Sequence, residues 1–324
     1  MIEKPLLSVS HLVTAFETEA GILRAVDDVS FDLTAGQTLG IVGESGCGKS
    51  VTALSIMRLL PKPSGRIGSG QILFKGLDII TLPPESLHEI RGNQISMIFQ
   101  EPMTALNPVH RIEKQLGEVF RLHYPGMTKG EIREASVGLL QKTGIPEPLK
   151  RMKEYPHQIS GGMRQRVMIA MALACKPDIL IADEPTTALD VTIQAQILKL
   201  IKDLQQETGM SVIFITHDLG VIAEICDDVV VMYAGKIAEK ASVNDLFARP
   251  AHPYTKGLLA SIPRLENPRK IKLHIIEGMV PALHELPVGC RFQNRCPEAQ
   301  AICRTKHPPE KMVGEGHFAS CYFV

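Results

Sequence analysis

The sequence has no apolar run that approaches the roughly 18 uninterrupted residues that a membrane-spanning helix requires. Residues 1–7 also lack the basic-then-apolar pattern of a signal peptide, so none is expected. Lysine plus arginine and aspartate plus glutamate number 35 each, so no excess charge favours nucleic acid or an anionic membrane surface. These absences predict a cytosolic chain without a nucleic-acid partner, which reaches a membrane only through other subunits.

Residues 43–50 carry the most informative motif, a glycine-rich run with the pattern GxxxxGKS. The motif follows the apolar run 38–42 and precedes an apolar helical pattern over 51–60, which is the context of a phosphate-binding loop. Glycines let backbone N–H groups approach phosphates at the positive end of a helix. Lys49 is expected to reach the β- and γ-phosphates, and Ser50 to bind Mg²⁺. The predicted nucleoside-triphosphate contacts are Gly43, Ser45, Gly46, Cys47, Gly48, Lys49, Ser50 and Val51.

A second apolar run, 178–182, ends in the acidic pair Asp183 and Glu184. A buried strand with two carboxylates at its C-terminal end suits phosphoryl transfer. The first carboxylate can hold Mg²⁺ through water, and the second can polarise an attacking water. Taken alone, an acidic pair after a strand is usually only a solvated strand end, so the neighbouring motifs decide its interpretation.

Those neighbouring motifs follow a fixed order along the chain. Gln100 closes the apolar run 95–99, and His217 follows the apolar run 212–216. The remaining polar positions of the pattern are Ser160, Gly161, Gly162 and Asp190. Six motifs in this order resemble the ATP-binding cassette (ABC) ATPase family, and the resemblance extends from about residue 6 to the C-terminus.

The resemblance implies a role for each position. Gln100 is implied to bind Mg²⁺ and sense the γ-phosphate, Glu184 to be the catalytic base and His217 to be the switch histidine. Asp190 belongs to the D-loop in this alignment. Phe16 falls where the family places an aromatic residue that stacks on adenine. ATP and Mg²⁺ are therefore the implied ligands.

The signature of the family is Ser160, Gly161 and Gly162, which here begins a helical pattern over 163–174. A serine and two glycines at a helix start can bind an anion, although alone they would be a plain helix cap. By the resemblance, the signature completes the ATP site of a second ATPase subunit. ATP held between Lys49 of one subunit and the signature of the other would join the two until hydrolysis.

The spacing of these motifs predicts an α/β fold with a mainly parallel sheet, because strands and helices alternate. The expected elements after the signature are strands at 178–183, 211–216 and 228–233 and a helix at 191–207. The resemblance implies a P-loop cassette over 1–240, with a RecA-like parallel sheet, an antiparallel β subdomain and a helical subdomain at about 101–165. A C-terminal extension is expected over 241–324.

The insert begins with a short apolar loop, 101–109, bounded by two prolines. In ABC importers, the groove beside this position receives a coupling helix of the membrane subunit. Met103, Leu106 and Val109 are candidates to pack against such a partner. The simpler interpretation is that these side chains form the loop's own core contacts, and without the resemblance it would come first.

Four of the seven cysteines, Cys290, Cys296, Cys303 and Cys321, fall within 32 residues near the C-terminus. Cytosolic thiols stay reduced, so a disulfide is disfavoured, and four thiolates can instead surround a metal or cluster. The spacing lacks the CxxC pairs that are typical of structural zinc. Some peptide-importer ATPases carry a [4Fe–4S] cluster on this pattern, so the resemblance implies one. Zinc or unoccupied thiols remain alternatives.

The segment around these cysteines, 287–324, contains few large apolar residues. We therefore expect its order to depend on the metal, and the core of the cassette to be independent of it.

Three further runs, 101–108, 155–163 and 182–194, resemble the ATPases of oligopeptide, dipeptide and nickel importers, and 252–260 opens an extension typical of peptide importers. The resemblance implies a peripheral ATPase at the cytoplasmic face of the inner membrane. Its implied partners are two transmembrane permease subunits, a second ATPase subunit and, indirectly, an extracytoplasmic solute-binding protein. The alternatives are an importer of nickel, glutathione or another small solute, a soluble ABC ATPase, and an ATPase gated by a metal or redox sensor in its tail.

Overall fold

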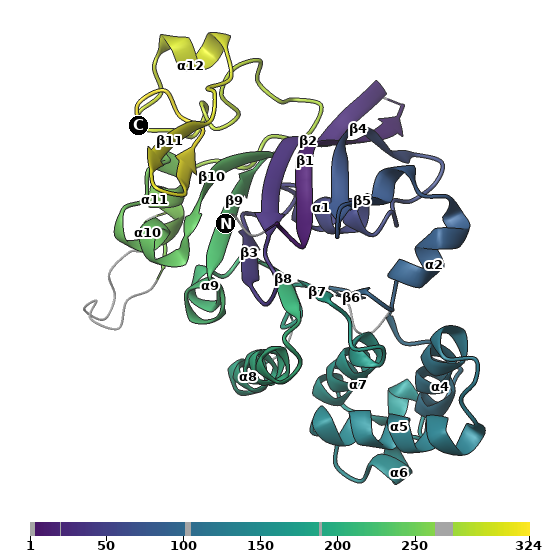
Figure 1. Cartoon of the computed structure of the whole chain (residues 1–324). Helices are drawn as coiled ribbons and strands as arrows, with labels where there is room; N and C mark the ends of the chain where they lie inside the picture. Colours follow the sequence, from purple (N-terminus) through teal and green to yellow (C-terminus); the bar gives the residue numbers. More distant parts are fainter. Residues whose placement is uncertain (1–3, 20, 101–104, 188–189, 263–274) are drawn as a thin grey trace. The chain divides into compact units, whose positions relative to one another are not determined.

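The computed structural model describes residues 4–19, 21–100, 105–187, 190–262 and 275–324. The chain forms two compact units. The first consists of residues 1–80 and 214–324, and the second of residues 81–213 (Figure 1). The first unit therefore contains both the glycine-rich loop 43–50 and the whole C-terminal extension.

The first unit contains an antiparallel sheet with the strand order β2-β1-β4-β5. Its strands are β1 (Leu7–Thr18), β2 (Gly21–Leu33), β4 (Gly65–Phe74) and β5 (Leu77–Asp78). Strand β1 pairs with both β2 and β4. Its apolar residues Leu7, Val9 and Leu12 are buried, which confirms the antiparallel β subdomain expected from the sequence.

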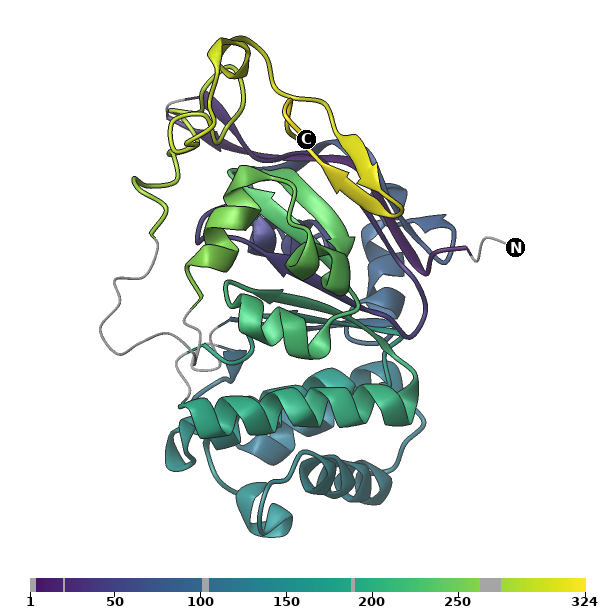
Figure 2. The ribbon, with the colours of Figure 1, turned by 90° about the vertical axis from the view of Figure 1, so that its left-hand side faces the viewer.

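A second sheet of the first unit runs in the order β11-β12-β10-β9-β3. Its strands are β3 (Thr38–Val42), β9 (Asp228–Tyr233), β10 (Lys236–Ser242), β11 (Lys311–Gly314) and β12 (His317–Ala319). Strands β3 and β9 are parallel, and every residue of β3 is buried, as expected for a parallel strand covered on both faces. The C-terminal strands β11 and β12 extend this sheet from β10 by antiparallel pairing (Figure 2).

The helices of the first unit are α1 (Lys49–Ile56), α9 (Leu219–Ile225), α10 (Val243–Ala248), α11 (Pro253–Ala260) and α12 (Ala301–Thr305). The apolar pattern over 51–60 predicted a longer α1. The helix ends earlier because Arg58 takes a left-handed conformation with φ of 50°, and such a residue terminates a right-handed helix.

The C-terminal extension shares its core with the rest of the first unit. Phe292 is 3% exposed, and its ring lies 5.1 Å from that of Tyr233 in β9 and 5.3 Å from that of Tyr254 in α11. These rings pack in one cluster with Val42 of β3. The expectation of a cassette core independent of the extension was therefore wrong, because Phe292 of the segment 287–324 packs into the same cluster as Tyr233.

The second unit contains the parallel strands β6 (Ile95–Ile98) and β7 (Ile179–Asp183). Its helices are α2 (Leu87–Ile90), α4 (Ile112–His123), α5 (Lys129–Lys142), α6 (Pro148–Arg151), α7 (Gly161–Leu173) and α8 (Val191–Thr208). Short 3₁₀ turns occur at Ile79–Thr81, Pro84–Ser86 and Pro156–Gln158. Strand β8 (Ser211–Thr216) leads the chain from this unit into the first.

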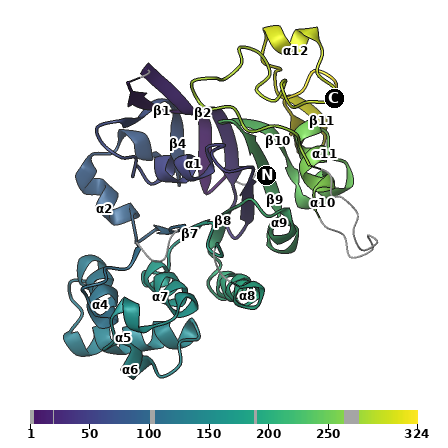
Figure 3. The ribbon, with the colours of Figure 1, turned by 180° about the vertical axis from the view of Figure 1, so that it is seen from behind.

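Helices α4, α5, α6 and α7 gather into one group (Figures 1 and 3). Ile112 and Leu116 of α4, Leu140 of α5 and Val167 of α7 pack in a common core. This group confirms the predicted helical insert between Gln100 and the signature. Among the described residues, no helix is both long and apolar enough to cross a membrane.

Candidate functional site

The loop 43–50, called the P-loop from here on, owes its shape to glycines that no other residue can replace easily. A Cβ atom at Gly43 would lie 2.2 Å from the carbonyl oxygen of Met232. Gly48 has φ of 105°, and a Cβ there would lie 2.7 Å from the carbonyl oxygen of Ala25. Gly48 is also the N-cap of α1, so the amides at the start of this eight-residue helix close the loop.

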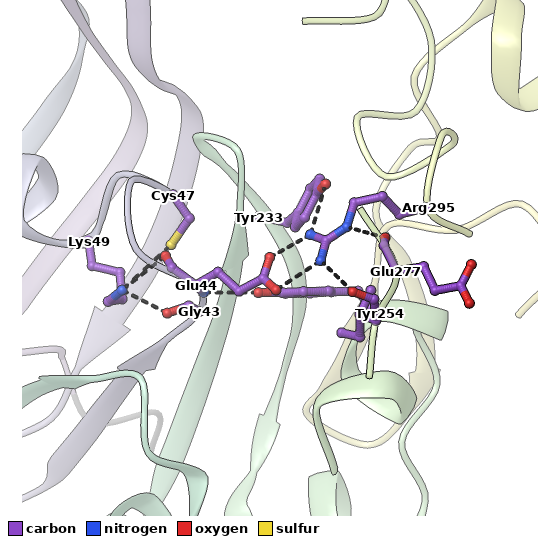
Figure 4. A network of polar contacts seen from close by, with 9 residues as sticks. Gly43, Glu44, Cys47, Lys49, Tyr233, Tyr254, Glu277 and Arg295 are labelled. Atoms are coloured by element: carbon purple, nitrogen blue, oxygen red, sulfur yellow. Dashed lines mark hydrogen bonds and ion pairs between the residues drawn. The ribbon is translucent and has the colours of Figure 1, made fainter. Parts of the chain in front are cut away.

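Lys49 is the only lysine buried in the described residues, with 4% of its surface exposed. Its Nζ donates hydrogen bonds of 2.7 Å to the carbonyl oxygen of Gly43 and 3.2 Å to that of Glu44 (Figure 4). The ammonium group therefore lies inside the loop's curve. Ser45 and Gly46 form the exposed tip of the loop. A cation held in a glycine-rich loop at a helix start has the chemistry to bind phosphate.

Cys47, which the sequence assigned to the same loop, is fully buried. Burial raises the pKa of its thiol, although the Lys49 charge acts in the opposite direction. This thiol stays protonated at neutral pH, which agrees with a small side chain that fills space. Ser50 and Val51 follow in the first turn of α1 and are half-buried.

Two other predicted positions lie in the first unit. Phe16 is half-buried in β1, where it pairs with Leu23 of β2 and Gly65 of β4. His217 is exposed directly after β8. Asp218 next to it caps α9 through a 2.8 Å bond from the Gly220 amide.

In the second unit, the side chains of Gln100 and Glu184 are in contact although they lie 84 positions apart in the sequence. The side-chain amide of Gln100 donates a 3.1 Å hydrogen bond to Oε2 of Glu184. The hydroxyl of Thr187 donates to the same oxygen at 2.9 Å. Asp183 is 4% exposed at the end of β7, and Glu184 is 8% exposed. The predicted base thus has its carboxylate oriented by two donors.

The backbone of Glu184 is itself unusual. Its φ is 45°, a left-handed conformation that non-glycine residues adopt at a cost of about 1–2 kcal/mol. The Thr187 amide donates to the Glu184 carbonyl oxygen at 3.1 Å, so a tight turn holds this conformation. Such strain is typical of residues whose orientation matters for function.

The signature residues begin α7 as predicted. The hydroxyl of Ser160 accepts a 3.3 Å hydrogen bond from the Met163 amide and caps the helix. A Cβ at Gly162 would lie 3.2 Å from the Ile193 side chain, whereas nothing lies within 4 Å of one at Gly161. Asp190 caps α8 through a 3.0 Å bond from the Ile193 amide. Two helix starts with open surface are therefore close neighbours in this unit.

The three candidate residues of the predicted loop 101–109 have different outcomes. Residues 101–104, and with them Met103, lie outside the described residues. Leu106 is 1% exposed and packs in the core of the helical group, whereas Val109 is 74% exposed. Leu106 therefore contributes to the unit's own core, and of the two described candidates Val109 is the one with apolar surface.

The four C-terminal cysteines, which are spread over 32 residues of sequence, lie around one cavity. Cys290, Cys296, Cys303 and Cys321 line one small cavity together with His252. The Cys290 amide donates a 2.7 Å hydrogen bond to the carbonyl oxygen of Cys303. The thiols are unpaired by disulfides, as the sequence predicted.

The arrangement of these thiols does not by itself form a metal centre. In the described parts of the chain, no three His, Cys, Asp or Glu side chains are placed as metal ligands. Burial raises the pKa of Cys290, and it raises that of Cys296 to about 11, so the thiol form is favoured. Four iron–sulfur ligands therefore remain a prediction: the four thiols line one cavity, but the described side chains are not placed as metal ligands.

Comparisons with known proteins identify the family. Residues 26–187 match the family model for ABC transporters, and residues 238–303 match that for the C-terminal region of oligopeptide/dipeptide transporters. A probable peptide ABC transporter ATP-binding protein of Sinorhizobium fredii is 53% identical over 98% of this chain and 94% of its own. A dipeptide transport ATP-binding protein of Bacillus subtilis is also 53% identical, with the same coverage. The chain belongs to the ABC transporter family.

Solved structures agree with this assignment. A dimeric ATP-binding cassette in a post-hydrolysis state with ADP and phosphate superposes with a TM-score of 0.66 at 27% identity. It covers 73% of this chain and 98% of its own length. The ABC cassette fold and the ATPase class expected from the motifs are confirmed. The boundary at 240/241 between cassette and extension stays a prediction.

The sequence patterns missed several residues of this ABC ATPase. Thr187 carries no motif signal beyond its position after the acidic pair, yet it contacts Glu184. Arg295 and Tyr254 of the extension contact Glu44 inside the P-loop. The sequence carries little signal for the contacts of Arg295 and Tyr254, because their partner Glu44 lies more than 200 positions away and such pairs produce no periodic pattern.

Proposed function

We propose that this ABC ATPase powers the import of di- or oligopeptides through a membrane transporter. The observation that carries the proposal is the joint match of the cassette and of residues 238–303, because the second model describes the C-terminal region of oligopeptide/dipeptide transporters. The relatives named as peptide or dipeptide transport ATP-binding proteins support the same cargo. An importer of nickel, glutathione or another small solute remains the alternative.

In the proposed site, the P-loop holds the phosphates of ATP. Lys49 is oriented by the carbonyl oxygens of Gly43 and Glu44, and the loop amides supply further donors. Phe16 is proposed to stack on adenine. Mg²⁺, bound with the nucleotide, offsets the charge of the phosphate oxygens; Ser50, Gln100 and Asp183 offer the oxygen ligands that it prefers.

Hydrolysis in this scheme depends on Glu184. Its buried carboxylate accepts hydrogen bonds from Gln100 and Thr187, which fix its direction. A water molecule beside the γ-phosphate would be oriented by Glu184 and lose its proton to it. His217 is proposed to contact the same phosphate and report its loss.

A second ATPase subunit, identical or homologous, is proposed to complete the site. The start of α7 at Ser160, Gly161 and Gly162 has backbone amides at the positive end of a 13-residue helix. Asp190 of the D-loop starts α8 beside it. Nucleotide shared between two chains would favour the closed pair, and hydrolysis would release it.

The remaining proposed partners are two transmembrane permease subunits, with an extracytoplasmic solute-binding protein acting through them. We place the chain at the cytoplasmic face of the membrane as a peripheral subunit, since its relatives are transport ATP-binding proteins. Val109, which is 74% exposed and lies nine positions after Gln100 in the sequence, is proposed to contact a permease.

The proposal is tested with the chain and its permease subunits in proteoliposomes that contain ATP, supplied with the loaded binding protein. Labelled dipeptide should accumulate on the ATP side, and Lys49→Ala should abolish both uptake and ATP consumption. Uptake of nickel or glutathione without any peptide uptake would replace the cargo. ATP-dependent uptake that Lys49→Ala leaves intact would remove the P-loop from the mechanism.

A second candidate function concerns the cysteine cavity. We propose that Cys290, Cys296, Cys303 and Cys321 hold a [4Fe–4S] cluster, with Zn²⁺ as the alternative. The support is that all four thiols line one cavity. Such a cluster would supply a rigid cross-link of the extension. The thiols would have to lose their protons to bind it, although burial favours the protonated form of Cys290 and Cys296.

Metal analysis after purification without oxygen decides between these readings. The cluster predicts about four irons per chain and absorbance near 400 nm, both lost in Cys296→Ser. Zinc in equal amount to protein and no iron would leave a structural zinc site. Protein without either metal, but folded and active, would show that the thiols are unoccupied.

A further inference from the structure

Arg295 of the C-terminal extension binds the side chain of a P-loop residue. Its Nη1 lies 2.5 Å from Oε2 of Glu44, and its Nη2 lies 3.0 Å from Oε1 of the same carboxylate (Figure 4). Glu44 is the second residue of the P-loop, 251 positions away in the sequence. A paired contact of this kind is among the strongest that a carboxylate can make, because both oxygens receive a charged donor.

The guanidinium group is held from several sides at once. Its Nε donates to the carbonyl oxygen of Glu277 at 3.0 Å, and Nη2 donates to that of Ile276 at 3.1 Å. Nη1 also lies 3.4 Å from the hydroxyl of Tyr233. Only 5% of the Arg295 side chain is exposed, against 30% for Glu44. The arginine is therefore a fixed point, and Glu44 is the partner that it orients.

The backbone of Glu44 connects this ion pair to the phosphate-binding lysine. The Glu44 amide donates a 3.0 Å hydrogen bond to the hydroxyl of Tyr254, which is fully buried. The Glu44 carbonyl oxygen accepts from Nζ of Lys49 at 3.2 Å. Side chain, amide and carbonyl of one residue are thus all engaged, and the extension supplies two of the three partners.

We propose that Arg295 is a positioning residue of the ATP site, which holds Glu44 and through it the turn that presents Lys49 to the phosphates. The inference rests on the proposed function, because it requires that the P-loop bind ATP. This proposal gives the extension a second role besides holding the cysteines, which is to fix the position of Glu44 in the P-loop. Arg295 directly precedes Cys296, so the segment that faces the cysteine cavity also supports the nucleotide site.

The chemistry of the contact makes a sharp set of variants. Arg295→Gln removes the charge, and Arg295→Lys keeps the charge but loses the planar fork that binds both oxygens. Glu44→Gln removes the other partner. Glu310→Gln is the matched control, because it breaks an ion pair of the extension with Lys240 that lies on β10 and touches no P-loop residue.

The experiment measures the Kd for a fluorescent ATP analogue, kcat, KM and thermal stability of the whole chain. Arg295→Gln should raise Kd and KM for ATP about tenfold, in line with the loss of a charged hydrogen-bonded pair. Arg295→Lys should raise them less. The double variant Arg295→Gln/Glu44→Gln should have a Kd for ATP no higher than that of either single variant, since both substitutions remove the same contact. Glu310→Gln should match the wild type.

Opposite results overturn the proposal. If Arg295→Gln lowers thermal stability but leaves Kd and KM at wild-type values, the ion pair only holds the extension. If the losses in the double variant multiply, Arg295 does not act through Glu44. Should Arg295→Gln fail to fold, Arg295→Lys decides by the same criterion. Lys49→Ala distinguishes a wrong proposal for Arg295 from a wrong proposed function. If the P-loop does not bind ATP, Lys49→Ala should bind ATP normally; if only the proposal for Arg295 is wrong, Lys49→Ala should still bind ATP weakly.

Discussion

The P-loop and the cysteine loop, residues 290–296, lie in the same unit but keep their shapes by different means. The P-loop is shaped by its own backbone, since Gly43 and Gly48 occupy places where a Cβ would strike carbonyl oxygens. The cysteine loop is held by side chains that reach other segments. Arg291 pairs with Asp27, and Phe292 fills the cluster around Tyr233.

This difference explains why one loop is obvious in the sequence and the other is not. A backbone-shaped site needs glycines at fixed spacing, so a pattern of eight residues identifies it. A loop held by side chains needs suitable partners anywhere in the chain, and Asp27 lies 264 positions from Arg291. The two loops nevertheless meet at Glu44 and Arg295, so changes in either test how far they depend on each other.

The largest effect is expected from Gly43→Ala, which attacks the backbone-shaped loop. The new Cβ would lie 2.2 Å from the Met232 carbonyl oxygen and 2.7 Å from Sγ of Cys47. We expect a loss of about 4 kcal/mol from overpacking and backbone strain, with ATP binding undetectable. Gly46→Ala is the control, because nothing lies within 4 Å of its Cβ and only its φ of 80° opposes the change. Nucleotide binding and urea unfolding check both; equal effects would contradict a steric cause.

Phe292→Ala should test the cysteine loop at its main side-chain anchor. Removing a ring that is 3% exposed should destabilise the first unit by about 3 kcal/mol, with a matching fall in the urea midpoint. The extension should also become sensitive to protease. Phe323→Ala, at a ring that is 43% exposed, should change the midpoint little. A cysteine loop that stays protected in Phe292→Ala would mean that its ion pairs or a metal hold it alone.

The extension should also weaken in mild acid. His252 is buried and its pKa is lowered to about 4, mainly by burial and then by the charge of His307. Below pH 6.5, the ordinary pKa of histidine, His252 binds a proton in the unfolded chain but stays neutral in the folded chain. Stability is therefore complete above pH 6.5 and is lost as the pH falls toward 4, by about 2 kcal/mol at pH 5.

His252→Asn isolates this contribution, because the amide oxygen can still accept from the Tyr254 amide, as the imidazole does at 3.0 Å. Urea unfolding at pH 7.5 and 5 should show a smaller acid loss in this variant. His284→Asn, at a side chain that is 58% exposed, should retain the wild-type loss. An unchanged acid loss in His252→Asn would assign the effect to other groups.

The smallest effect is expected at Thr187, where a side chain positions the proposed base. Thr187→Val removes one of the two donors to Glu184 at nearly constant volume. Loss of one hydrogen bond of about 1 kcal/mol should lower kcat about fivefold and leave the Kd for ATP unchanged. Thr187→Ser should restore most of the turnover. A raised Kd with normal kcat would place Thr187 in binding rather than in orientation of Glu184.

Much of the fold follows from local pattern. Strands were predicted at 211–216 and 228–233, and β8 and β9 have these bounds; the apolar run 38–42 forms β3. Helix α8 was predicted at 191–207 and ends at Thr208, where Gly209 takes φ of 72°. The end of α1 escaped prediction, because a left-handed Arg58 has no signature in the sequence.

The site divides in the same way. Lys49, Ser160 and Glu184 were recognisable because phosphate chemistry fixes residue type and spacing. Arg295 was not, because an arginine between two cysteines has many possible partners, and only the fold selects Glu44. Contacts between distant side chains are set by packing, which no local pattern records.

The central proposal is that this ABC ATPase hydrolyses ATP, with the P-loop binding the phosphates and Glu184 acting as the base. The most direct test measures ATP affinity and turnover of Glu184→Gln in one preparation. The Kd for ATP should stay within about twofold of wild type, while turnover falls at least about 100-fold, because general-base catalysis is lost and the cradle around Lys49 remains. Turnover near the wild-type rate would contradict the claim and remove Glu184 from catalysis.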